Sequence, residues 1–325
     1  MRYIDLFAGA GGLSEGFTRA GFEAVAHVEM NQDACFTIKT RLAYHFLKDK
    51  GKLDAYEYYL KDEISRDALY HYIPKEILAS VINAQISDAT IESIFSQIDA
   101  LNGDKKIDLI VGGPPCQAYS VAGRGRIKNI NEKQQNSEKQ TDERYFLFRQ
   151  YVKFLEKYQP NMFVFENVTG LVTAGGGVYL EEMCQEFKKI GYEVNIHLDK
   201  NKNTEKVDIF DTSNYGVLQS RKRVIVVGCK EGFAFDMSKF KIDTINFNVK
   251  KDLLEDLPSL QPNDGHRTTD YTKKATDYQK KYYIRDAFFD FTTLHATRPH
   301  NERDLKIYNP PKYKNIYQML SNIKY

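Results

Sequence analysis

Short apolar runs alternate with longer segments of helical periodicity along most of this chain. This alternation is typical of β-α-β units, whose strands lie parallel in one sheet. It predicts strands at Tyr3–Phe7, Glu23–Val28, Asp108–Val111, Met162–Glu166, Glu193–Leu198 and Arg223–Cys229, and helices at Leu13–Ala20, Asp33–Arg41, Arg144–Tyr158 and Leu180–Ile190. We therefore expect an α/β fold, a doubly wound and mostly parallel sheet with helices on both faces.

The segments between these elements indicate how the chain divides into domains. Residues 44–80 are rich in Tyr and charged side chains at helical spacing, and we expect an inserted helical layer there. Residues 120–143 are polar and poor in large apolar side chains, and beyond about residue 252 the chain becomes charged and Tyr-rich. These shifts predict a first domain at 1–245, which carries the insertion, and a second region at 246–325.

Composition excludes several classes of protein. The 325 residues hold 46 Lys and Arg against 44 Asp and Glu, a net charge of +2, so any basic face must be local. No apolar run approaches the roughly 20 residues of a membrane span, and no signal-peptide profile precedes the first glycine-rich turn. Since the four Cys are scattered and form no CxxC pair, we expect neither a zinc site nor a disulfide framework. This Cys pattern is typical of a protein in the reducing cytoplasm.

A glycine-rich turn follows the first predicted strand. In Asp5–Phe17 (DLFAGAGGLSEGF) a strand ends and a helix begins, and Gly9 and Gly11 permit the close backbone approach that a ligand loop needs. Ser14 stands at the third glycine position of the dinucleotide fingerprint, which weakens a pyrophosphate-binding interpretation. Glu29, at the end of the second strand, is placed to accept hydrogen bonds from ribose hydroxyls. The pattern indicates a ligand crevice, with a tight structural turn as the alternative.

Cys116 stands in a rigid setting directly after the strand Asp108–Val111. In GGPPCQAYS (112–120) two prolines hold the backbone extended, so that Cys116 is presented at the carboxyl end of a strand. A thiol of pKa ~8.5 is only a few per cent thiolate at neutral pH but is a strong nucleophile. A lone Cys is more often a small buried hydrophobe. The surrounding Gly and Pro favour a nucleophile here, whereas the other three Cys lie in periodic segments and are expected in the core.

Two further polar motifs adjoin apolar strands. In FVFENV (163–168), Glu166 ends a strand, where an acid can equally be a helix cap or a turn residue. In QSRKR (219–223), strand alternation places Arg221 and Arg223 on one side and Lys222 on the other. Because a charge run at the start of a strand is usually solvated surface, neither motif identifies a function alone.

Together, and in this order, the four motifs resemble those of the DNA cytosine-5 methyltransferase family, restriction–modification type. Residues 5–17 are similar to that family's cofactor loop, PCQ (115–117) to its nucleophile motif, ENV (166–168) to its acidic motif and QSRKR (219–223) to its paired-arginine motif. The resemblance spans about residues 4–228, and weaker similarity continues at 253–265 and 294–308.

The resemblance implies a reaction and the residues that carry it. S-adenosylmethionine would be the cofactor, and carbon 5 of a cytosine flipped out of double-stranded DNA would accept the methyl group. Cys116 would add to carbon 6 of the base, and Glu166 would hold ring nitrogen 3 and the exocyclic amine. Arg221 and Arg223 would anchor the carbonyl oxygen, the thiolate side or an adjacent phosphate. No metal is expected.

The same resemblance implies the cofactor and DNA contacts. Phe7 would lie against the adenine, Met30 on its opposite face and Glu29 on the ribose, while Asp88 would meet the adenine amine, with Asp104 as its rival. The segment 120–143 would close over the flipped base as a lid. The remaining residues implied are Gly9, Gly11, Pro114 and Leu147 for the cofactor, and Gln117, Ser120, Arg124 and Arg126 for DNA.

The end of the sequence departs from the family pattern. The family's last motif carries a Gly-Asn pair, and that dipeptide does not occur in these 325 residues. We therefore expect an incomplete recognition region at 246–325. Two alternatives stay open: a half subunit that is inactive without a complementary C-terminal polypeptide, and a tRNA cytosine-5 methyltransferase. A nicotinamide oxidoreductase is disfavoured because it leaves Cys116 unexplained. The implied location is the bacterial cytoplasm, on the nucleoid and without membrane contact.

Overall fold

The computed structural model describes residues 1–115, 137–195, 197–199, 204–206, 209–217, 219–236, 248–285, 288–299, 301 and 303. They form two compact units, unit 1 (Met1–Lys50 and Tyr70–Ile245) and unit 2 (Gly51–Leu69 and Asn246–Tyr325). Among the described helices, none has the length and apolar character needed to cross a membrane.

Unit 1 is built on a central sheet. Its strands are β1 (Arg2–Leu6), β2 (Glu23–Glu29), β3 (Val81–Asn83), β4 (Leu109–Gly112), β5 (Met162–Val168), β6 (Glu193–Val194), β9 (Ile209–Asp211) and β10 (Lys222–Cys229). The helices are α1 (Gly12–Arg19), α2 (Gln32–Asp49), α5 (Lys75–Ala79), α6 (Ile91–Asn102), α8 (Ser137–Tyr158), α9 (Gly170–Thr173), η1 (Ala174–Gly177), α10 (Val178–Lys189) and η2 (Thr212–Tyr215). A hairpin of β7 (His197–Asp199) and β8 (Thr204–Lys206) lies outside the sheet.

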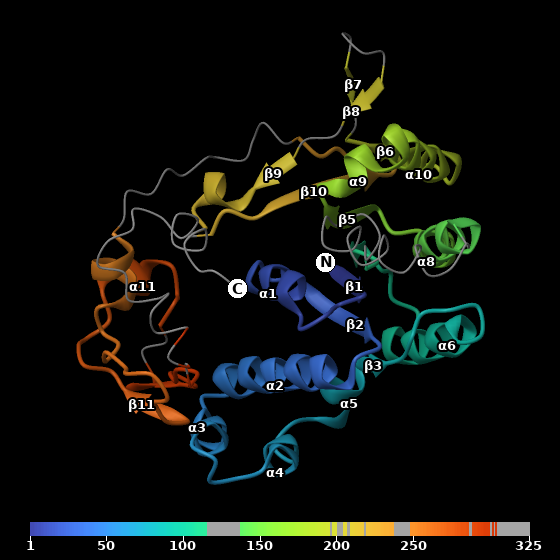
Figure 1. Ribbon diagram of the computed structural model, residues 1–325. Coiled ribbons are helices and arrows are strands. Elements are labelled where there is room, and N and C mark those ends of the chain that lie inside the picture. Colours follow the sequence, from blue (N-terminus) through green and yellow to red (C-terminus); the bar gives the residue numbers. More distant parts are fainter. Residues whose placement is uncertain are drawn as a thin grey trace. The chain divides into compact units, whose positions relative to one another are not determined.

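The strands of unit 1 follow the order β3-β2-β1-β4-β5-β10-β6, with β9 paired to β10 (Figure 1). From β3 to β5 all neighbours are parallel, whereas β10 runs antiparallel to β5, β6 and β9. The strand order reverses between β1 and β4, and such a switch point is where doubly wound sheets bind ligands, at the carboxyl ends of the strands. The expected doubly wound, mostly parallel fold is confirmed.

Helices cover both faces of this sheet because side chains alternate along each strand. Tyr3 and Val111 lie on the face where Phe17 of α1 packs. Ile4 and Ile110 point to the opposite face and join the main hydrophobic core. That core is completed from the helices α6, α8 and α10 by Ile94, Phe95, Ile98, Phe148, Tyr151, Phe154, Leu180, Met183 and Phe187.

Several predicted elements differ from the structure in extent. The strand predicted at Glu193–Leu198 is wrong as one element, because only β6 joins the central sheet and residues 197–199 pair with β8 instead. The helix predicted at Asp33–Arg41 continues to Asp49 as α2, and α8 begins at Ser137 rather than at Arg144. The strands β3 and β9 were not predicted, since three residues carry too little periodicity to be recognised.

Unit 2 combines two distant parts of the chain. Its elements are α3 (Asp54–Leu60), α4 (Arg66–Tyr70, whose last residue belongs to unit 1), η4 (Val249–Leu254), β11 (Thr268–Asp270), α11 (Asp277–Lys281) and β12 (Phe291–Thr293). Arg267 donates hydrogen bonds to the carbonyl oxygens of Leu60 (3.2 Å) and Tyr59 (3.4 Å). Sequence reasoning assigned 44–80 to the first domain, whereas residues 51–69 pack within unit 2 because of such contacts.

Candidate active site

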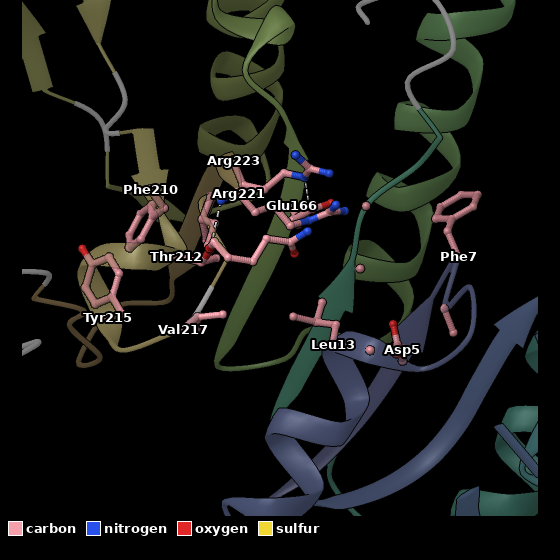
Figure 2. Close-up of a pocket in the computed structure, with 16 residues that line it drawn as sticks. Asp5, Phe7, Leu13, Glu166, Phe210, Thr212, Tyr215, Val217, Arg221 and Arg223 are labelled. Carbon is pink, nitrogen blue, oxygen red and sulfur yellow. Dashed lines mark hydrogen bonds and ion pairs between the residues drawn. The ribbon is translucent and has the colours of Figure 1, made fainter. Parts of the chain in front are cut away.

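A cavity of about 800 Å³ opens in unit 1 at the switch point of the sheet (Figure 2). The ends of β1 and β4 and the start of α1 form one side, and β9, η2 and β10 form the other. The lining residues are Asp5, Phe7, Ala8, Gly12, Leu13, Gly112, Gly113, Glu166, Phe210, Thr212, Tyr215, Val217, Gln219, Arg221, Arg223 and Ile225. The cavity therefore brings Phe7, Glu166, Arg221 and Arg223 together from motifs far apart in the sequence.

Two glycines let the end of β4 approach its neighbours. Gly112 has φ +141°, and a Cβ there would lie 2.0 Å from the carbonyl oxygen of Leu6. A Cβ on Gly113 would lie 2.0 Å from the carbonyl oxygen of Glu166. Any side chain at either position would collide with backbone, so the GG pair is a packing requirement of this strand end.

The chain that leads to Cys116 is fixed by the acidic motif. Asn167, which is buried, donates from Nδ2 to the carbonyl oxygen of Pro114 at 3.2 Å. This contact ties the nucleophile segment to β5 and was not foreseen from the sequence. Cys116 itself lies outside the described residues, as do the four expected DNA contacts Gln117, Ser120, Arg124 and Arg126.

Glu166 and Arg223 form an ion pair at the cavity wall. Arg223 Nε donates to Glu166 Oε1 at 2.6 Å, and the two side chains are 21% and 33% exposed. The antiparallel register of β10 on β5, with Ile225 opposite Glu166, sets this pairing. Figure 2 shows the two side chains together, with Arg221 beside them. The ion pair thus fixes the orientation of the carboxylate.

Arg221 is held differently from Arg223. Its backbone N–H donates to Thr212 Oγ1 at 3.1 Å, which fixes the strand position. Within the described part of the chain its guanidinium, which lines the cavity, has no partner. The two arginines therefore differ: Arg223 is paired with Glu166, whereas Arg221 is anchored through its backbone.

A buried carboxyl group lies under the glycine-rich turn. Asp5 is 1% exposed and accepts a hydrogen bond from Ser14 Oγ of α1. Burial raises the pKa of Asp5 to about 7, the charge of Glu29 acts in the same direction, and the Ser14 hydrogen bond opposes both. Sequence reasoning noted Ser14 only as a break in a fingerprint, because its partner could not be seen.

Glu29 ties the turn after β1 to the end of β2. Its Oε2 accepts the backbone N–H of Gly9 at 2.8 Å, and its Oε1 accepts the backbone N–H of Asn31 at 2.7 Å. Next to it, Met30 is 63% exposed. Phe7, at the end of β1, lines the cavity and has φ +56°.

Asp88 follows the carboxyl end of β3 and is linked to α8. Gln150 Nε2 donates to Asp88 Oδ1 at 2.9 Å, and Lys153 forms an ion pair with the same oxygen. The Lys153 hydrogen bond, with that of Gln150, lowers the pKa of Asp88. Leu147, one turn earlier on α8, is half-buried. Asp104 lies between α6 and β4, before a strand begins, and so at the opposite edge of the sheet.

One wall of the cavity was not anticipated. Phe210 and Tyr215 stack with ring centroids 5.6 Å apart and 28° between their planes, and Figure 2 shows them beside Val217. No periodic or motif signal in the sequence marks them. Within the described residues, no group of three or more His, Cys, Asp or Glu side chains could hold a metal ion.

The fold and the site together define a protein of the S-adenosylmethionine-dependent methyltransferase fold. The model of the C-5 cytosine-specific DNA methylase family matches residues 1–58 and 43–324. The chain therefore belongs to the C-5 cytosine-specific DNA methylase family.

Individual relatives agree with this assignment. The chain is 36% identical to the type II methyltransferase M.Bpa9945I of Bacillus paralicheniformis, over 95% of this chain and 73% of the relative. It is 28% identical to M1.HphI of Haemophilus parahaemolyticus, over 71% of this chain and 46% of the relative. A solved structure of a proposed DNA modification methyltransferase from an E. coli prophage matches with a TM-score of 0.59 and 19% identity, over 97% of this chain and 76% of that one. The likeness to this solved structure shows the fold alone. The chain spans about half the length of M1.HphI.

Proposed function

We propose that this protein methylates carbon 5 of cytosine in double-stranded DNA, with S-adenosylmethionine as the methyl donor. The observation that carries the proposal is the cavity in which Glu166, Arg221 and Arg223 converge beside Gly113, three residues before Cys116. A carboxylate and two guanidinium groups at that place match the hydrogen-bonding edge of a cytosine and the charge that develops on it.

The residues after three adjacent parallel strands fit the cofactor. Phe7 follows β1, Glu29 ends β2 and Met30 follows it, and Asp88 follows β3, so all stand on the carboxyl edge of the sheet. They supply two apolar surfaces for an adenine, acceptors for ribose hydroxyls and an acceptor for the adenine amine. The position of Asp88, at this edge, favours it over Asp104. When bound, the cofactor would supply an electrophilic methyl group on sulfonium sulfur.

The chain's own residues would activate the base. The Cys116 thiolate forms a bond to carbon 6, and the electron pair of the 5,6 double bond then gives carbon 5 the nucleophilic character it lacks in free cytosine. Glu166, held by Arg223, accepts a hydrogen bond from the exocyclic amine, and a proton taken up from solvent is shared between its second oxygen and ring nitrogen 3, where it neutralises the negative charge that the thiolate brings. After methylation, carbon 5 gives its proton to a water molecule, the electron pair of that C–H bond re-forms the 5,6 double bond, and the bond from Cys116 to carbon 6 breaks, which restores the thiolate.

Arg221 would bind the negative charge nearest the flipped base. Its guanidinium lines the cavity and, within the described residues, has no other partner. A carbonyl oxygen of the base or an adjacent phosphate offers the matching acceptor. Flipping a base costs a few kcal/mol, and a charge-assisted contact of this kind offsets part of it.

Transfer of a tritiated methyl group from S-adenosylmethionine tests the proposal directly. We expect label in duplex DNA and none in tRNA, and a covalent adduct with duplex that contains 5-fluorocytosine. Cys116→Ser should bind cofactor as the wild type does but form neither product nor adduct. Label in tRNA alone would move the substrate to RNA, and a Ser variant as active as the wild type would refute the covalent mechanism.

A further inference from the structure

The turn that carries Glu29 and Met30 is anchored by a side chain of the neighbouring strand. Asn83, the last residue of β3, donates from Nδ2 to the carbonyl oxygens of Glu29 and Met30, both at 3.0 Å. In the parallel register Asn83 lies opposite Glu29, the last pair of the β2–β3 ladder. The amide of Asn83 therefore adds a second donor to the Glu29 carbonyl and reaches the Met30 carbonyl, one residue beyond the last residue of β2.

Other contacts leave the same turn little freedom. The N–H of Ala84 donates to the Glu29 carbonyl oxygen at 3.0 Å, and Cys35 Sγ donates to it at 3.3 Å. The Glu29 carboxylate accepts the N–H groups of Gly9 and Asn31. Of these anchors, only the Asn83 amide holds the carbonyl of Met30 as well as that of Glu29 among the hydrogen bonds described for this turn.

This anchoring holds the main chain that carries a half-buried carboxylate, Glu29, and an exposed apolar side chain, Met30. Met30 is 63% exposed, so packing against the core does not determine where its side chain lies. The two hydrogen bonds from Asn83 help to hold the main chain at Met30, and the main chain sets the Cα–Cβ direction from which the side chain extends. A residue with a fixed orientation binds a ligand more tightly than a mobile one, because less conformational entropy is lost on binding.

We propose that Asn83 is a positioning residue for the nucleoside half of the cofactor. It acts through Glu29 and Met30 and does not itself touch the ligand. This inference rests on the proposed function, since it assigns Glu29 to the ribose and Met30 to the adenine. The side chain must be short and must carry a two-proton donor, and asparagine meets both requirements, whereas aspartate would set oxygen against two carbonyl oxygens.

Calorimetry on the full chain at 25 °C tests the proposal with two ligands, S-adenosylmethionine and 5′-methylthioadenosine, which lacks the amino-acid part. Asn83→Ala should raise the Kd of both ligands by the same factor, about three- to tenfold, and Asn83→Asp should raise both Kd values further. In methyl transfer the KM for the cofactor should rise, while kcat at saturating cofactor stays unchanged.

Asn195→Ala is the matched control. Asn195 also bridges backbone groups, donating to Ile225 O at 3.3 Å and accepting from Val227 N at 2.7 Å, but it does so beside β10. It should bind both ligands as the wild type does.

Each outcome has one meaning. Wild-type protein that binds neither ligand contradicts the proposed function itself. If the wild type binds and Asn83→Ala binds equally well, the positioning role is refuted. If Asn83→Ala and Asn195→Ala lose affinity equally, the loss reflects a general disturbance of the structure, and the positioning role is refuted. The role is also refuted if Asn83→Ala binds S-adenosylmethionine more weakly but binds 5′-methylthioadenosine as the wild type does.

Discussion

Replacing Asp5 by Asn should change how the stability of unit 1 depends on pH. Asp5 is 1% exposed, and burial raises its pKa from 3.8 to about 7. Between these values the native protein keeps a proton on Asp5 that the unfolded chain has released. The stability that Asp5 contributes is therefore fully present below about pH 4 and is lost as the pH rises through 7.

The size of the effect follows from the shift in pKa. From 3.8 to about 7 is a little over three pKa units, and at 1.36 kcal/mol per unit the contribution is at most about 4 kcal/mol. Asn keeps an oxygen that can accept the Ser14 hydrogen bond but cannot ionise. The stability of Asp5→Asn minus that of the wild type should thus rise by up to about 4 kcal/mol between pH 4 and pH 8.

Urea unfolding followed by far-UV circular dichroism measures this difference at half-unit steps of pH, since the chain has no Trp to report by fluorescence. Other titrating groups occur in both proteins and cancel in the difference. Ser14→Ala is the companion variant: it removes a hydrogen bond that lowers the pKa of Asp5, so its transition should move to higher pH. A difference between Asp5→Asn and the wild type that stays constant from pH 4.5 to 8 would refute the reasoning.

Three further predictions concern other groups of unit 1. Burial lowers the pKa of His27 from 6.5 to about 4, so its neutral form is required in the native state and stability falls as the pH drops from 6.5 towards 4. The free energy of unfolding of His27→Phe should therefore rise relative to that of the wild type by up to about 3 kcal/mol as the pH falls across that range. Urea unfolding in which both proteins lose stability equally between pH 6.5 and 4 would contradict this. Glu29→Ala should raise the Kd for S-adenosylmethionine by about one to two decades, because a charged hydrogen-bonding partner is lost; unchanged affinity in calorimetry would place the ribose contact elsewhere. Arg223→Gln leaves Glu166 without its 2.6 Å partner and should lower kcat/KM for DNA about 10- to 100-fold at unchanged cofactor affinity. A parallel loss of cofactor binding would show instead that the whole sheet edge had been disturbed.

The local signals in the sequence were enough to predict the architecture. Buried strands such as Ile4–Leu6 and Leu109–Val111 stand out as apolar runs, and the glycines and prolines that follow them mark where the chain must turn. Because the carboxyl ends of parallel strands share one edge, Phe7 and Glu166 are expected there, whereas Arg221 and Arg223 precede or begin a strand and reach the same edge because β10 runs antiparallel to β5. Phe7, Glu166, Arg221 and Arg223 do line one cavity.

The contacts within the site depended on tertiary structure. Arg223 meets Glu166 across 57 positions, and Asn83 meets Glu29 across 54. Such pairs follow from strand register and neighbour order, which no local pattern encodes. The same reason explains why residues 193–198 divide between two sheets and why 51–69 pack with residues beyond 246. The motifs of the sequence thus identify the residue types of the site. The partner of each side chain is determined by the tertiary structure, because it depends on which distant strands lie side by side.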